Sequence, residues 1–156
     1  MLRWHVMKKI NGFTLIELIV TIAVFGVIVA LATPSFLTTI QRTQLNSDSR
    51  DFVDVLNEQR SEAILKQRNI ILAFNTSVVG ANKVWISSSN TKWFGGSPTV
   101  NSLTFTMMGR LDGGGQCFIL QHVSNINLKA VIIIRKSGMI IYNKATSVCP
   151  ADLGVE

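Results

Sequence analysis

The stretch KKINGFTLIELIV, residues 8–20, places two lysines and a glycine directly before a long apolar run. The run continues to residue 32, and Glu17 is the one ionisable residue in its twenty positions. A helix of this length spans about 30 Å, which is the thickness of the hydrocarbon core of a bilayer. The sequence therefore predicts a membrane-spanning segment over residues 13–33, with a carboxylate near its start.

Charge beside this segment predicts its orientation. The chain has a formal net charge of +6, and Arg3, Lys8 and Lys9 precede the apolar run while no acidic residue does. The positive-inside rule then leaves the amino terminus in the cytoplasm and exports the rest of the chain. A secretory signal peptide is the alternative, with VIVALATPS, residues 27–35, as its cleavage site. The length of the run and the position of Gly12 before it favour the membrane anchor.

GFTLIEL, residues 12–18, behind a short basic leader resembles the type III signal of type IV pilins and pseudopilins. The resemblance implies that a prepilin peptidase cuts after Gly12 and methylates the new amino terminus at Phe13. It also implies that Glu17 pairs with the amino terminus of a neighbouring subunit in a filament. The other interpretation of Glu17 is a carboxylate that reaches the membrane surface, where ionised groups cost less than at membrane depth. Either Met1 or Met7 fits as the start of the leader.

Beyond the anchor the helical pattern continues. Pro34 falls where the family has a proline, and it predicts a bend because proline removes one backbone hydrogen bond. Four apolar residues then follow one narrow stripe of a helical face up to about residue 67, and they are Leu45, Phe52, Leu56 and Ala63. This half of the helix is expected to lie with its apolar stripe against another layer.

From residue 68 the apolar residues occur in short runs separated by turn residues, which is typical of strands. The predicted strand segments are 69–74, 83–89, 102–108, 116–122, 128–136 and 138–144, the last two forming a hairpin around Gly138. The expected fold is α+β: a leader at 1–12, a membrane segment at 13–33, an exported helix at 34–67 and an antiparallel β domain at 68–156. The exported half of the helix packs on that domain.

Both cysteines, Cys117 and Cys149, lie in the part predicted to be exported. An even pair in an oxidising compartment predicts a disulfide. Two separate buried thiols are the alternative.

Later segments narrow the resemblance to the GspH/FimT branch of pseudopilins. They are RSEAILKQRNIILAF at 60–74, LTFTMMGRLDGG at 103–114 and IIIRKSGMI at 132–140. Members of that branch are minor subunits of type II secretion pseudopili or of type IV pili, and some act in DNA uptake. In the DNA-binding members an arginine-rich pair follows the hairpin glycine, whereas here Gly138 is followed by Met139, Ile140 and Ile141.

The resemblance implies a structural subunit of the inner membrane, with its carboxyl-terminal domain in the periplasm until it enters a pilus or pseudopilus. Its expected partners are other subunits, the prepilin peptidase and membrane lipid, and no cofactor is expected. His122 is the one histidine outside the leader, and no group of residues has metal-ligand spacing, so an enzyme is not expected.

DNA is the alternative partner. Its candidate contacts are Arg110, Arg135, Lys136 and Lys144, with Trp85 and Trp93 as aromatic surfaces on which bases could stack. The competing interpretation makes the two tryptophans part of the core. A single contiguous basic face in the folded chain would favour DNA.

Overall fold

The computed structural model describes residues 12–96, 98–144, 146–151 and 153, and for residues 32–34 it describes the backbone alone. Its elements are one helix and seven strands in the order α1 (Leu15–Leu65), β1 (Ile70–Phe74), β2 (Lys83–Trp85), β3 (Thr91–Trp93), β4 (Ser102–Phe105), β5 (Gln116–His122), β6 (Lys129–Ile134) and β7 (Ile140–Asn143). The chain divides into two compact units, one ending at Thr38 and the other beginning at Thr39. Each unit is described by itself.

A side-chain cap starts the helix of the first unit. The backbone N–H of Glu17 donates to Thr14 Oγ1 at 3.3 Å, and the N–H of Leu18 donates to the carbonyl of Thr14 at 3.2 Å. Thr14 is therefore the N-cap residue and Glu17 the third helical residue, the two positions of a capping box. The cap explains why α1 begins at Leu15.

The described side chains of the first unit form no buried core. Every side chain from 13 to 31 is exposed, and the large apolar ones are between 48% and 84% exposed. Within the described residues, no single helix meets the length and hydropathy expected of a membrane span; Leu15–Leu31 and Ser35–Leu65 meet them only when taken together. The membrane segment predicted at 13–33 stays a prediction.

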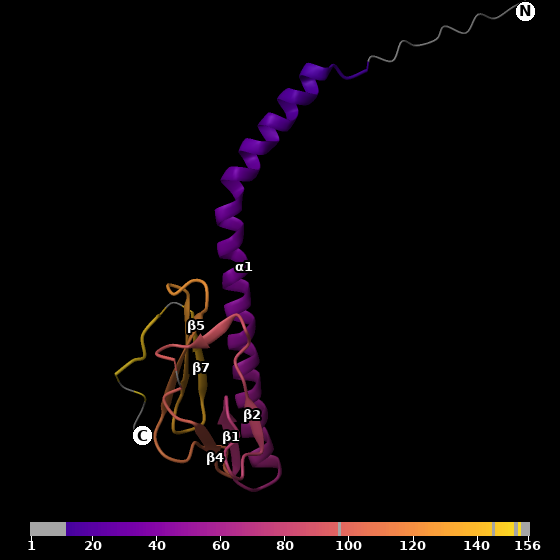
Figure 1. Cartoon of the computed structure of the whole chain (residues 1–156). Helices are drawn as coiled ribbons and strands as arrows, with labels where there is room; N and C mark the ends of the chain where they lie inside the picture. The colour runs from indigo at the N-terminus through magenta and orange to yellow at the C-terminus, as the bar shows by residue number, and fades with distance from the viewer. Residues whose placement is uncertain (1–11, 97, 145, 152, 154–156) are drawn as a thin grey trace, which may run out of the picture. The chain divides into compact units, whose positions relative to one another are not determined.

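The second unit has its core between α1 and two sheets, as Figure 1 shows for the strands beside the carboxyl-terminal half of the helix. The predicted stripe of Leu45, Phe52, Leu56 and Ala63 is buried, with no more than 4% exposed at any of them. Phe52 is the centre of an aromatic cluster, because its ring lies 4.6–5.7 Å from the rings of Phe74, Trp85, Trp93 and Phe118. Such tilted and edge-to-face ring contacts stabilise the core by more than the buried area alone would.

The two sheets have the strand orders β2-β1-β4 and β3-β5-β6-β7. Four of the five strand pairs are antiparallel, and β6 and β7 form the predicted hairpin. Two details differ from the expectation. β1 and β2 pair in parallel, with Leu72 opposite Lys83, and β3 forms where no strand was predicted. β3 is short, but its two outer residues, Thr91 and Trp93, are buried and hold it against β5.

Polar side chains on both sides of the buried stripe of α1 attach the helix to the sheets. Asp51 accepts a hydrogen bond from the indole N–H of Trp85 at 2.8 Å, and Asn46 accepts one from the hydroxyl of Tyr142 at 2.8 Å. Nearer to Thr39, Gln44 bonds to His122 and Gln41 bonds to Asn125, both at 3.0 Å. These contacts fix which part of the helix lies beside the β5–β6 turn.

Candidate assembly site and basic surfaces

The residues of the amino-terminal motif are placed as an exposed helix start. Gly12 precedes the cap, Phe13 is 84% exposed, and Glu17 lies in the first turn of α1. A Cβ added to Gly12 would meet no atom within 4 Å, so the described residues leave room for a side chain there. The hydrogen bond from Glu17 to Thr14 Oγ1 uses the backbone N–H of Glu17 and not its carboxylate. The Glu17 carboxylate is thus available for contacts outside the chain, and processing at Gly12 and Phe13 stays a prediction.

The bend predicted at Pro34 concerns residues 32–34, whose side chains lie outside the described part of the chain. The backbone of α1 continues through them to Leu65. The predicted bend stays a prediction.

Cys117 and Cys149 form a disulfide with a Cα–Cα distance of 6.0 Å. Cys117 is buried in β5, so the bond fastens the carboxyl-terminal tail to the second sheet. Gly115 adds a second contact, since a Cβ there would lie 2.6 Å from the carbonyl oxygen of Leu153. The alternative of two separate thiols is excluded in this structure.

The four candidate DNA contacts separate into two places. The backbone N–H of Leu111 donates to the carbonyl of Lys136 at 3.0 Å, which joins the 106–110 turn to the β6–β7 turn. Arg110 and Lys136 consequently line one hollow of about 590 Å³, together with Asp112 and the exposed Met107 and Met108.

Arg135 is the residue before Lys136 and closes the β6–β7 turn, where its N–H donates to the carbonyl of Met139 at 2.9 Å. Arg110 and Lys136 in the hollow, together with the neighbouring Arg135, are named the distal basic surface below.

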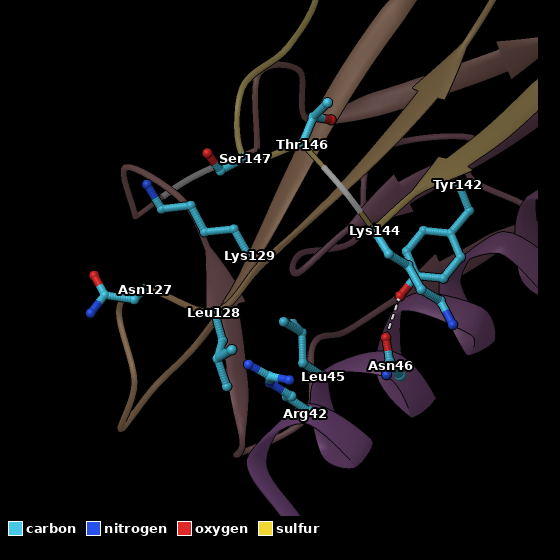
Figure 2. Close-up of a pocket in the computed structure, with 10 residues that line it drawn as sticks. All are labelled: Arg42, Leu45, Asn46, Asn127, Leu128, Lys129, Tyr142, Lys144, Thr146 and Ser147. Atoms are coloured by element: carbon cyan, nitrogen blue, oxygen red, sulfur yellow. Dashed lines mark hydrogen bonds between the residues drawn. The ribbon is translucent and has the colours of Figure 1, made fainter. Parts of the chain in front are cut away.

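Lys144 lies elsewhere, in a groove of about 470 Å³ between α1, the start of β6 and the segment after β7 (Figure 2). The described residues that line it include the three cations Arg42, Lys129 and Lys144 and no acidic residue. Figure 2 shows the three side chains spread along the groove, with Lys129 and Lys144 extending in different directions. The Lys129 ammonium lies 3.9 Å from the centroid of the Phe94 ring, a cation–π contact.

Tyr142 forms part of the same groove. Its hydroxyl donates to Asn46 Oδ1, which leaves the amide N–H groups of Asn46 free to donate elsewhere. Burial raises the pKa of Tyr142 above its ordinary value of 10.0, while a hydrogen bond with Ser49 and the charge of Arg50 oppose that rise. No pattern in the sequence indicates this groove, because its walls come from segments more than eighty residues apart.

The prediction that Trp85 and Trp93 offer surfaces on which bases could stack is wrong. Trp85 is 4% exposed and Trp93 is 3% exposed, and their rings lie 5.3 Å apart inside the core. They pack against Phe52 instead of facing solvent. The interpretation of the two residues as core tryptophans is the correct one.

His122 has a structural environment. Its Nδ1 accepts from the backbone N–H of Ser124 at 3.1 Å, so in the neutral ring Nε2 carries the proton and donates to Gln44 Oε1. His122 is 4% exposed. Over the described residues there is no group of three or more His, Cys, Asp or Glu side chains that could hold a metal ion.

Comparisons with known proteins agree with both parts of the chain. Residues 7–33 match the model of the prokaryotic N-terminal methylation motif. The fold is similar to the crystal structure of the type IV minor pilin FimU of Pseudomonas aeruginosa, with a TM-score of 0.52 and 19% identity over 67% of this chain and 92% of that one. A second crystal form of FimU has a TM-score of 0.47 and 20% identity over 64% and 92% of the two chains. No curated protein matches the sequence.

The match in fold covers 67% of this chain, and the motif covers residues 7–33. The methylation motif and the pilin fold together support a type IV pilin-like protein.

Proposed function

We propose that this chain is a minor pilin or pseudopilin that is held in the inner membrane by residues 13–33 until it enters a filament. The observation that carries the proposal is the methylation motif at a capped helix start whose large apolar side chains are exposed in the described part of the chain. Leaving this much apolar surface in water is costly, so it requires lipid or neighbouring subunits. The domain after Thr39 would then lie at the filament tip or surface and make recognition contacts.

Glu17 is proposed as the assembly residue. After cleavage at Gly12, the new amino group of Phe13 would lie at the same helix end as this carboxylate. An ionised side chain at membrane depth is costly and is usually paired. A neighbouring subunit's amino terminus supplies the opposite charge, so pairing offsets the cost only in the filament.

Processing is tested at Gly12. Gly12→Leu should leave the leader attached, because the peptidase must accept a small residue there, while the described fold has room for the side chain. Mass spectrometry of the membrane-extracted protein reads the mature mass. Gly26→Ala is the control, since a Cβ there also meets nothing within 4 Å. A wild-type chain that begins anywhere other than Phe13 would refute the proposal.

Assembly is tested at Glu17. Glu17→Ala keeps the backbone N–H that Thr14 caps, so the helix start should persist. The variant should insert into the membrane as well as wild type and co-purify less with other subunits. Thr14→Ala is the matched control for a weakened helix start. Wild-type incorporation of the Glu17 variant would show that the carboxylate has no pairing role.

DNA binding in uptake is the second candidate function, and the distal basic surface is the observation that favours it. Arg110 and Lys136 line one hollow, and Arg135 precedes Lys136 in the same turn, so a phosphate contact here would not need the tryptophans. Replacing all three by Gln should weaken binding to a DNA duplex at least about tenfold and reduce its salt dependence. Lys144→Gln, in the other groove, is the control. Equal binding by the triple variant and wild type in fluorescence anisotropy would exclude this surface.

A further inference from the structure

We propose that the end of the domain next to Thr39 is a docking surface for an anionic membrane. It consists of the β5–β6 turn, residues 123–128, and the groove cations Arg42, Lys129 and Lys144. This inference rests on the proposed function, because it requires residues 13–33 to lie in the bilayer.

Location along the chain is the first support. Asn125 in the turn bonds to Gln41 at 3.0 Å, and His122 just before the turn bonds to Gln44. The turn therefore lies beside the first helical turns of the second unit, as Figure 1 shows above β5. Gln41 follows residue 32 by nine helical residues, a length of about 14 Å at most. The headgroup layer adds about 5–8 Å to the hydrocarbon on each side, and the Debye length in physiological salt is about 8 Å. Gln41 is thus tethered within electrostatic range of the lipid phosphates.

Charge is the second support. The groove at this end carries three cations, and no acidic residue is among the described residues that line it. The described ion pairs, Lys66–Glu62 and Lys83–Glu58, use none of the three. The cations are spread along the groove (Figure 2) instead of meeting at a point. Such spacing suits a surface with many phosphates better than one small anion.

An exposed apolar residue on a fixed turn is the third support. Ile126 is 63% exposed and Val123 is 44% exposed. The turn is held in place from within, because Gln121 Nε2 donates to the carbonyl of Ile126 at 3.1 Å and the N–H of Asn127 donates to Asn125 Oδ1 at 3.3 Å. Apolar side chains beside cations are the combination that binds peripheral segments to anionic bilayers. A neighbouring subunit's acidic face is the competing occupant.

The experiment places the full-length processed chain in nanodiscs of phosphatidylcholine alone or with about 30% phosphatidylglycerol. Hydrogen exchange of residues 123–129 is measured by mass spectrometry in both. We expect exchange about tenfold slower in the anionic discs, because each basic residue near such a surface strengthens attraction about fivefold. The slowing should fade at about 0.5 M salt, where the charges are screened.

Two matched pairs of variants assign the effect. Replacing Arg42, Lys129 and Lys144 by Gln should abolish the slowing, while the same change at Arg68, Arg135 and Lys136 should leave it intact. Ile126→Ser should reduce it, while Val79→Ser, at a side chain 98% exposed on another loop, should not.

The outcomes distinguish a failure of this inference from a failure of the proposed function. A chain that does not co-elute with either disc contradicts the membrane anchor and thus the proposed function. A chain that co-elutes but exchanges equally in both discs overturns only the lipid contact. Slowing that occurs only after other filament subunits are added also overturns it and assigns the surface to a neighbouring subunit.

Discussion

At the scale of single residues, Gly138 and Gly109 come so close that a side chain at Gly138 would overlap the backbone. Gly138 has a φ of +83°, and a Cβ there would lie 1.9 Å from the carbonyl oxygen of Gly109. The same carbonyl accepts a hydrogen bond from Arg60 Nε at 3.0 Å. The glycine that the sequence marked only as a hairpin turn therefore also allows the end of α1, the 106–110 turn and the β6–β7 turn to meet.

Gly138→Ala should destabilise the domain by more than about 3 kcal/mol, because a left-handed φ and a backbone overlap act together. Gly113→Ala is the control: its φ is +94°, but its Cβ would meet nothing within 4 Å. That change should cost only about 1–2 kcal/mol. Thermal unfolding of both variants in detergent gives the comparison, and equal losses would show that the close approach to Gly109 is unimportant.

Tyr142 supplies a prediction about pH. Its pKa is raised by burial in the folded chain, so the folded state keeps the phenol proton where the unfolded chain has begun to lose it. The stability that this provides is complete below pH 10 and declines as pH rises through the higher folded pKa. Tyr142 is the chain's only tyrosine, so phenolate absorbance reports on it alone.

We expect that absorbance to have its midpoint above 10 in the folded protein and near 10 in denaturant. Tyr142→Phe should lose less stability than wild type between pH 9 and 11. A folded midpoint at or below 10 would contradict the burial of the hydroxyl.

At the scale of elements, the sequence predicted what is periodic or local. The stripe from Leu45 to Ala63 and the hairpin at Gly138 follow from spacing and turn chemistry, and both are present. β3 was missed because three residues with an exposed lysine at the centre give too short a pattern. The parallel β1–β2 pair was missed because neighbouring strands usually form antiparallel hairpins.

The candidate sites also differ in whether they are local in the sequence or assembled by folding. The amino-terminal motif is contiguous, so the sequence was sufficient to find it. The distal basic surface and the groove around Tyr142 are assembled by tertiary packing between distant segments. The tryptophans show the converse error, because composition cannot tell an aromatic binding surface from a core.

The carboxyl-terminal tail gives the prediction at this scale. Its disulfide joins residues 32 apart in the sequence, and closing such a loop stabilises by about 3–4 kcal/mol on the chain-entropy model. Protein made in the periplasm should contain no free thiol, and reduction should lower its melting temperature by several degrees. The Cys117→Ser/Cys149→Ser variant should melt like the reduced protein and not respond to reductant. Two freely titrating thiols in the folded protein would refute the bond.

At the scale of the whole molecule, the two units differ in whether their apolar side chains are buried. The buried apolar core begins at Leu45 and contains none of the described residues of the first unit. The first unit's described apolar residues from Phe13 to Leu37 are all exposed. One chain thus combines a self-sufficient domain with a helix that depends on its surroundings.

A fragment of residues 39–156 should therefore fold and remain monomeric without detergent, whereas the full chain should require it. Circular dichroism and gel filtration of the two proteins provide the measurement. If the fragment loses its near-ultraviolet signal from the buried tryptophans, the core depends on residues before Thr39.

The cap at Thr14 has a further consequence for the supply of subunits. Both of its hydrogen bonds join residues after Gly12, so cleavage there would remove neither of them. An uncut precursor should accordingly be as well folded as the mature chain and accumulate instead of being degraded. In a cell that makes both, the precursor would occupy the same membrane pool while lacking the free amino end, and the ratio of the two would set how often a growing filament meets a usable subunit.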